Sequence, residues 1–407
     1  MPDLNNQLES LLSEEVAAAV QREQRAWDDL ASPFGNSLVL FGAGNLGRKT
    51  LSGLRQIGIQ PLAFADNNPQ RWGTQMSDVP VLSPVDAAAQ YGRSAAFVVT
   101  VWNAGQQHRT RTLQQQLQGL GCQRALTICP LFWKFPDIFL PFHALDLPHK
   151  VLGQKEQVRH VYRQLADEQS RREFVAQLKF RLRGDFDGMP DPVTGAQYWP
   201  HDIIVFQTDE HFVDCGAFDG DTIREIVRGK HVRIRKLTAF EPDPVNFERL
   251  RRFIRSLPEN IQPLLTAHRA AVGNKTGSLR FNADASAGAS VVRGGAPTGE
   301  GKVTAETIVE VQCVALDVIL KDDTPTYIKM DIEGSELDAL EGARNIINRH
   351  HPVLAICAYH VQDHLWRVPA LIHEIWDQYR LYFRPHEREG WDLVCYAVPP
   401  QRLAHHP

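Results

Sequence analysis

The amino-acid sequence predicts an α/β protein in which two regions alternate buried strands with helices. Two strand–turn–helix units carry this prediction: SLVLFGAGNLG at 37–47 and FVDCGAFDGDT at 212–222, each with glycines where a strand ends. Similar alternation continues after each unit, which is typical of parallel sheets with helices on their faces. The length of 407 residues exceeds that of one ordinary domain, so we expect two sheets in separate domains.

Composition and charge favour a globular protein that binds neither nucleic acid nor membrane. Hydrophobic residues make up 43% and charged residues 23%, and the net charge is −4. The basic run RRFIR at 251–255 has the spacing of a solvated helix face, and no apolar run has the length of a membrane span. The six cysteines form no C-x-x-C pair, so neither disulfides nor a cysteine zinc site are expected. The N-terminal residues lack the features of a secretory signal, so we expect a cytoplasmic protein.

The chain divides into four predicted segments. Apolar residues at helical spacing predict an N-terminal helix within 1–32, which would dock on the protein or form a homo-oligomer. A small α/β domain is predicted at 33–130 and a second α/β domain at 203–407. The stretch between them, 131–202, begins with an aromatic and proline-rich connector and continues as helix. We do not expect regular secondary structure in that connector.

Two further expectations concern the second α/β domain. A single strand is predicted at 264–272. The Gly/Ala/Ser-rich stretch at 284–303 is predicted to be a mobile loop near the ligand.

The glycine turn at 212–222 has the composition of a site for a cationic ligand. Its glycines do not follow G-x-G-x-x-G spacing, and the aspartates Asp214, Asp219 and Asp221 would repel a phosphate. They favour a ligand with amine, hydroxyl and sulfonium groups, such as S-adenosylmethionine. Glu241, at the end of the next strand, has the position of an acidic residue that binds ribose hydroxyls.

Three blocks in this region resemble the FkbM-type family of S-adenosylmethionine-dependent methyltransferases. They are FVDCGAFDGDT, AFEPDPVNFERL and YIKMDIEGSELDALEGA, and the resemblance covers about residues 205–400. It implies a class I (Rossmann-like) methyltransferase domain: a seven-stranded, mostly parallel sheet with an antiparallel strand near the C-terminus. It also implies S-adenosylmethionine as cofactor and methylation of a hydroxyl of a sugar-containing or natural-product acceptor, a small molecule or glycan. The residues expected to bind the cofactor are Asp214, Gly216, Phe218, Asp219, Gly220, Asp221, Thr222, Glu241, Pro242 and Asp331.

Methyl transfer to a hydroxyl requires a group that takes up its proton, and two residues at predicted strand ends qualify. His360 is expected to titrate near neutrality and to act as general base. Asp331 could orient His360, bind the methionine ammonium or be the base itself. Asp331, Glu333 and His360 could together hold a divalent metal, but their spacing matches no dedicated cage, so no metal is predicted. Glu336 is expected to face solvent or to cap the following helix.

The stretch YHVQDHLWRVP at 359–369 is similar to a family variant that reads H-x-x-x-D-L-W-x-I-P. His364 stands where that aspartate would be, which leaves open what replaces the acid. For Trp366 we prefer a place in the core to a place in the acceptor pocket.

The earlier turn matches G-x-G-x-x-G at Gly42, Gly44 and Gly47, and Asp66 closes the next strand. This second candidate nucleotide site would make the chain an NAD-dependent oxidoreductase, although no Tyr-x-x-x-Lys pair was found for hydride transfer. Residues 37–83 also resemble the small Rossmann-like domains of sugar-modifying enzymes, some of which bind a nucleotide-sugar. The remaining alternative is a non-catalytic scaffold that binds a nucleotide or cofactor.

Overall fold

The computed structural model describes residues 3–103, 105, 108–195, 197–229, 233–283, 285–286, 288–293, 296–297 and 307–404. The chain forms two compact units. The first comprises Met1–Glu156, Arg172–Asp191 and Glu387–Trp391, and the second comprises Gln157–Arg171, Pro192–His386 and Asp392–Pro407. The division into four segments at residues 32, 130 and 202 stays a prediction.

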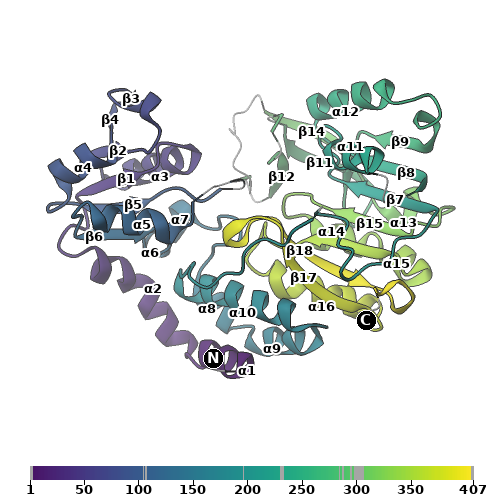
Figure 1. The fold of residues 1–407 in the computed structure, drawn as a ribbon, viewed down its shortest axis with the longest axis horizontal. Coiled ribbons are helices and arrows are strands. Elements are labelled where there is room, and N and C mark those ends of the chain that lie inside the picture. Colours follow the sequence, from purple (N-terminus) through teal and green to yellow (C-terminus); the bar gives the residue numbers. More distant parts are fainter. Residues whose placement is uncertain are drawn as a thin grey trace. The chain divides into compact units, whose positions relative to one another are not determined.

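The first unit is built on a six-stranded sheet with the order β3-β4-β2-β1-β5-β6 (Figure 1). All pairs are parallel except β3 with β4. The strands are β1 (Leu38–Phe41), β2 (Ala63–Ala65), β3 (Gln75–Met76), β4 (Val79–Leu82), β5 (Ala96–Val99) and β6 (Arg124–Thr127). The helices between them are α3 (Asn45–Gln56), α4 (Pro84–Tyr91) and α5 (Thr110–Gly119), with a 3-10 turn η1 (Pro69–Arg71).

Both faces of this sheet are covered, because every residue of β1, β2 and β5 is buried. Alternate residues point to opposite faces. Val39, Phe41 and Phe97 form one core cluster with residues of α4 and α5. On the other face, the Phe64 ring lies beside Gly47 of α3. The continuous apolar runs of these strands are therefore those of a buried parallel sheet.

The N-terminal helix is interrupted, contrary to the single helix predicted from the spacing. The structure has α1 (Leu4–Leu12) and α2 (Val16–Ala31), with Glu15 in an extended conformation between them. Ala19, Glu23, Trp27 and Ala31 recur every fourth residue and form the buried stripe of α2. α2 packs on α6 and α8 of the same unit.

The expectation that the aromatic connector lacks regular structure is wrong. Three short helices occupy it: α6 (Cys129–Lys134), α7 (Pro136–Phe139) and α8 (Pro148–Leu152). Each has a proline in its first turn, where the missing N–H costs no hydrogen bond and the fixed φ favours a helix. The rings of Phe132 and Phe139 stack with centroids 4.5 Å apart. Two longer helices follow, α9 (Lys155–Gln164) and α10 (Glu168–Arg183).

The second unit contains a seven-stranded sheet with the order β17-β18-β16-β15-β7-β8-β9 (Figure 1). Its pairs are parallel except those that β18 makes with β16 and β17, which confirms the predicted sheet with an antiparallel strand near the C-terminus. The strands are β7 (Glu210–Cys215), β8 (Ile234–Phe240), β9 (Leu265–His268), β15 (Tyr327–Met330), β16 (Val353–Cys357), β17 (Arg380–Pro385) and β18 (Leu393–Val398). The helices are α11 (Asp221–Arg228), α12 (Pro244–Ser256), α13 (Leu316–Ile319), α14 (Glu336–Glu341), α15 (Arg344–His350) and α16 (His364–Ile375).

A smaller sheet in the same unit has the order β10-β14-β11-β12-β13. Its strands are β10 (Ala271–Val272), β11 (Gly277–Asn282), β12 (Ser290–Arg293), β13 (Ala296–Pro297) and β14 (Ile308–Val314). The strand predicted at 264–272 is thus two strands, β9 and β10, which belong to different sheets. β12 and β13 fall within the predicted loop at 284–303, and the rest of that loop lies largely outside the described residues. The chain also forms three 3-10 turns, η2 (Gln262–Leu264), η3 (Arg388–Gly390) and η4 (Pro400–Arg402).

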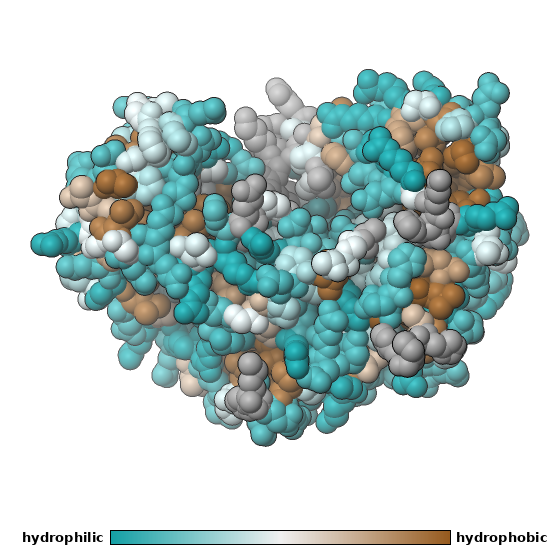
Figure 2. All heavy atoms as spheres, in the orientation of Figure 1, coloured by the Kyte–Doolittle hydropathy of each residue, from teal (hydrophilic) through white to brown (hydrophobic). Residues whose placement is uncertain are grey.

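The surface and the cysteines agree with a chain that buries most of its large apolar residues. Hydrophilic residues dominate the face shown in Figure 2, and apolar residues gather there in separate small groups. All six cysteines are buried and free. Within the part of the chain that the structure describes, no helix has the length and apolar character of a membrane span.

We predict that Gly47→Ala destabilises the first unit, whereas Gly44→Ala does not. A Cβ at Gly47 would lie 2.1 Å from the Gly42 carbonyl oxygen, and backbone cannot yield as a flexible side chain can. The expected loss is roughly 1–3 kcal/mol of the free energy of unfolding. A Cβ at Gly44 would meet no atom within 4 Å. Urea denaturation of both variants measures this, and equal losses would contradict the account.

Candidate active site

Three neighbouring strands of the seven-stranded sheet end level with one another. Met330 of β15 pairs with Cys215 of β7, and Cys215 pairs with Phe240 of β8. The residues that follow these strands are Asp331, Gly216 and Glu241, so the register brings them to one edge of the sheet. Ligands of open parallel sheets bind outside this edge, at the carboxyl ends of the strands.

The turn after β7 needs its glycines for both conformation and space. Gly216 and Gly220 have φ of +83° and +90°, in the left-handed region. A Cβ on Gly216 would lie 1.9 Å from the Asp331 carbonyl oxygen, and one on Gly220 would lie 2.6 Å from the Phe253 ring. The amides of Gly216 and Ala217 both donate to the Phe240 carbonyl oxygen at 3.0 Å. The turn is therefore fixed against both neighbouring strands before it enters α11.

Glu241 is fixed toward this turn by backbone donors. Its Oε2 accepts from the Phe218 amide at 2.9 Å and its Oε1 from the Asp243 amide at 2.8 Å. Burial raises the pKa of Glu241 to about 8, although both hydrogen bonds favour the ionised form. Pro242 follows, and Asp243 caps α12 by accepting from the amides of Val245 and Asn246.

Asp214 lies beneath the turn with no exposed surface, and Lys329 balances its charge. Lys329 Nζ is 3.0 Å from Asp214 Oδ1 and donates to the Gly216 carbonyl oxygen at 2.6 Å. Burial alone would lower the pKa of Lys329, but Asp214 and Asp331 outweigh it and hold that pKa above its ordinary value. Asp214 therefore supports the turn, and any effect it has on a ligand acts through the turn.

The three aspartates of this turn repel a phosphate less than the sequence predicts, because two of them face basic side chains. Asp219 lies 3.7 Å from Arg224, on the surface. Asp221 is exposed in the first turn of α11, where its Oδ1 accepts from the Thr222 amide at 2.7 Å. Lysine and arginine thus face two of the three aspartates, which the sequence argument did not consider. The acidic groups at the edge itself are Glu241 and Asp331.

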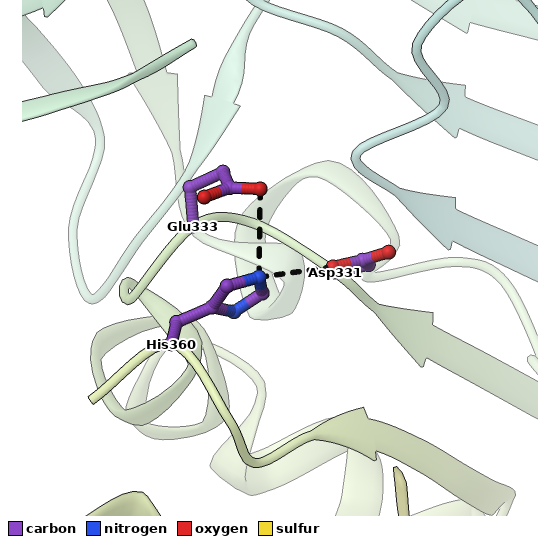
Figure 3. Close-up of side chains that lie close together, drawn as sticks. All are labelled: Asp331, Glu333 and His360. Atoms are coloured by element: carbon purple, nitrogen blue, oxygen red, sulfur yellow. Dashed lines mark ion pairs between the residues drawn. The ribbon is translucent and has the colours of Figure 1, made fainter. Parts of the chain in front are cut away.

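His360 and two carboxylates converge beside this edge, as Figure 3 shows. His360 Nε2 lies 3.4 Å from Asp331 Oδ1 and 3.4 Å from Glu333 Oε1. The Tyr198 hydroxyl donates to Asp331 Oδ2 at 3.1 Å. The side chain of His360 is 2% exposed, those of Glu333 and Asp331 17% and 26%. The cluster is therefore open on its carboxylate side.

Glu336 belongs to this cluster, and the expectation that it faces solvent is wrong. It is fully buried, and its Oε1 lies 2.8 Å from His360 Nδ1. The same oxygen accepts from the Ile332 amide at 3.1 Å, while Oε2 lies 3.1 Å from His364 Nδ1. His364, which stands where the family variant has aspartate, thus binds a carboxylate from another element. That unusual histidine was the signal in the sequence, because a buried imidazole needs a polar partner.

The neighbours of His360 act against the predicted titration near neutrality. Burial would lower its pKa, but Glu333 and Glu336 outweigh burial and raise the pKa well above the ordinary value. Glu336 is affected in the opposite direction: burial would raise its pKa, but His360 and His364 outweigh burial and hold that pKa below its ordinary value. The direction of the shift at His360 does not favour this residue as general base.

The residues after His360 are structural. Trp366 has no exposed surface and lies in the core, as preferred from the sequence. Asp363 pairs with Arg367 at 3.0 Å near the surface.

In the first unit, the turn at Gly42–Gly47 is held by Asp66. The Asp66 carboxylate accepts from the amides of Ala43 and Asn68, both at 2.8 Å, and from Arg71 at 3.0 Å. Gly42 has φ of +123°, and its carbonyl oxygen accepts from the Thr100 hydroxyl. Protein donors therefore already engage the carboxylate that was expected to bind a ribose, and a nucleotide at this turn stays a prediction.

Comparisons with known proteins agree with this geometry. Residues 214–384 match the family model described as the methyltransferase FkbM domain. Among solved structures, the chain is similar to methyltransferase FkbM from Methylobacillus flagellatus KT, with a TM-score of 0.72 and 22% sequence identity. The match covers 97% of this chain and 99% of that one. The search of curated proteins found no match.

We predict that Lys329→Met destabilises the second unit strongly. Loss of Lys329 leaves the Asp214 carboxylate buried without its partner, which costs roughly 3–5 kcal/mol of the free energy of unfolding. The double variant Asp214→Asn/Lys329→Met removes both charges and should recover part of this loss. The control is Lys236→Met, because Lys236 of β8 pairs with Asp323 at the surface and contributes at most about 1 kcal/mol. Equal losses for the two lysines in urea denaturation would contradict the assignment.

Proposed function

Because residues 214–384 match the family model of the methyltransferase FkbM domain, we propose that the enzyme methylates a hydroxyl oxygen of a sugar-containing or natural-product acceptor. The observation that carries the proposal is the convergence of Gly216, Glu241 and Asp331 at the level ends of β7, β8 and β15. Gly216 gives a tight backbone turn, Glu241 would accept hydrogen bonds from a ribose, and Asp331 would lie at the methyl group of the cofactor.

S-adenosylmethionine, when bound, supplies an activated methyl group on a sulfonium sulfur. The residues present fit this group, because Glu241 keeps acceptor capacity on both oxygens after its two backbone bonds. Two ribose hydroxyls that donate to Glu241 would favour its ionised form, as its backbone bonds already do. Gly216 allows the turn to lie directly against Asp331, since any larger side chain would meet the Asp331 carbonyl group.

Asp331 is the residue to which we assign the proton of the acceptor hydroxyl. When the acceptor oxygen takes the methyl group from the sulfonium sulfur, the Asp331 carboxylate would accept the hydroxyl proton. Asp331 is the most open member of the cluster, with 26% of its side chain exposed, whereas His360 is 2% exposed. His360 then acts beside Asp331 as a positioning residue and not as the base.

The glycine turn at Gly42–Gly47 in the first unit supports a second, weaker proposal, a site for a nucleotide-sugar. The space beside Gly44 is open, since a Cβ there would meet no atom within 4 Å, and a nucleotide-sugar donor or acceptor could approach the turn there. An NAD-dependent oxidoreductase would need the Asp66 carboxylate, which three protein donors already bind. Self-association through the N-terminal helices and a cytoplasmic location also stay predictions.

We predict that Glu241→Gln weakens binding of S-adenosylmethionine by about 10- to 100-fold. A neutral amide would replace the carboxylate that accepts two ribose hydrogen bonds, and a hydrogen bond to a charged group contributes about 1.5–3 kcal/mol. Isothermal titration calorimetry on the full chain measures this. Glu225→Gln is the control, because Glu225 is exposed on α11. Binding that is unchanged in Glu241→Gln would contradict the ribose assignment, and a folded wild type that binds no cofactor would contradict the proposed function.

We also predict that Asp331→Asn lowers the rate of methyl transfer by about 10²- to 10⁴-fold, the range of general base catalysis. Binding of the cofactor should change much less. The assay incubates the enzyme with S-adenosylmethionine labelled in the methyl group and a panel of glycans and polyhydroxylated compounds, and the product is examined by NMR for an O-methyl group. A variant with the wild-type rate would remove Asp331 from the role of base. Labelled products bearing only N-methyl groups would contradict transfer to oxygen.

A further inference from the structure

We propose that Asp331, Glu333 and His360 bind one divalent metal ion, which would hold the acceptor hydroxyl beside the methyl group; this second role rests on the proposed function. One ligand atom from each of the three residues lies within 4.8 Å of the others. Figure 3 shows the carboxylates of Asp331 and Glu333 near the same ring nitrogen of His360. They come from two strand ends, since Asp331 and Glu333 follow β15 and His360 follows β16.

His360 presents a nitrogen that no protein group satisfies. Among the described residues, Nε2 has no hydrogen-bond partner, although it is buried and faces Asp331 Oδ1 and Glu333 Oε1 at 3.4 Å each. A cation between the three atoms would take the place of a proton on Nε2, and this nitrogen and the two carboxylate oxygens would then each coordinate it.

Glu336 sets the imidazole in the state that a metal ligand requires. Glu336 Oε1 lies 2.8 Å from His360 Nδ1 and can accept a hydrogen bond from a protonated Nδ1. This leaves Nε2 as the coordinating atom. Metal-binding histidines generally donate their second ring nitrogen to a carboxylate or carbonyl in this way. His364, 3.1 Å from the other oxygen of Glu336, fixes this carboxylate from a third element, α16.

The backbone at Glu333 is bent to bring its carboxylate to the cluster. Glu333 has φ of +53° and Gly334 has φ of +95°, both in the left-handed region. Such a conformation at a residue with a side chain costs about 1–3 kcal/mol and is found where function requires it. A Cβ on Gly334 would lie 3.2 Å from Val361 and 3.9 Å from His360, so the glycine also lets the two loops approach.

The charge and the ligand types favour a first-row divalent ion. Asp331 and Glu333 bring two carboxylates to His360 Nε2, while Glu336 lies between His360 and His364. Carboxylates suit Mg²⁺ and Mn²⁺, while imidazole suits Zn²⁺ and related metals, so a mixed set points to Mn²⁺ or Zn²⁺. Three protein ligands leave positions open, and the exposed carboxylate side is where an acceptor oxygen would enter. Coordination through Asp331 Oδ1 leaves its Oδ2 for the hydroxyl proton.

The test titrates the chelator-treated full chain with Mn²⁺ alone and follows free Mn²⁺ by electron paramagnetic resonance. The wild type should bind one ion. Glu333→Gln and Asp331→Asn should each lower the affinity by more than 10-fold, and Glu336→Gln by about 10- to 100-fold, as for other residues that orient a metal ligand. Glu341→Gln is the control on the same helix, because Glu341 pairs with Arg344 at the surface. Circular dichroism shows that each variant is folded.

Two results would overturn the inference: no Mn²⁺ bound by folded wild type, or equal affinity in Glu333→Gln and Glu341→Gln. Calorimetry with S-adenosylmethionine on the same chelated samples separates the two proposals. Cofactor binding without any Mn²⁺ binding removes the metal and leaves the methyltransferase proposal intact. Mn²⁺ binding without cofactor binding supports the metal site and contradicts the proposed function.

Discussion

The level ends of β7, β8 and β15 are the constraint on which the rest of the site depends. Their register brings the glycine turn, Glu241 and Asp331 to one edge, and the Lys329–Asp214 pair joins two of these strands directly beneath the turn. Lys329 also holds the Gly216 carbonyl group. A change of register by one residue would send these side chains to the other face of the sheet. The proposed cofactor site therefore depends on strand pairing and not on the turn alone.

The reacting end is built differently, from loops that buried polar contacts hold together. Glu336 binds both His360 and His364 and also accepts from the amide of Ile332, so a single carboxylate joins the loop after β15, the loop after β16 and α16. Buried polar contacts that join several elements restrict the motion of the groups they connect. Asp331 and Glu333, the two carboxylates beside the imidazole Nε2, are the partly exposed members of the cluster.

Sequence patterns predicted the features that short motifs encode. They missed the contacts between residues that lie far apart in the chain. Glycines, strand-end acids and three motif blocks were enough for the α/β class, the seven-stranded sheet and the methyltransferase domain. The partner of Asp214 lies 115 positions along the chain at Lys329, and only the register makes the two meet. Glu336 was placed in solvent because a glutamate in a first helical turn usually caps it, whereas tertiary packing turns it toward His360. In the connector, the high aromatic and proline content led to a prediction of irregular structure, whereas three of the prolines lie in the first turns of short helices.

We propose that an adenosyl ligand lies across the Gly216 turn, with its ribose on Glu241 and its reacting end on Asp331. A crystal structure of the full chain with S-adenosylhomocysteine tests this most directly. We expect both ribose hydroxyls within hydrogen-bond distance of the Glu241 carboxylate and the sulfur on the side of Asp331. A ligand bound instead at the Gly42–Gly47 turn, or a ribose that does not contact Glu241, would contradict it.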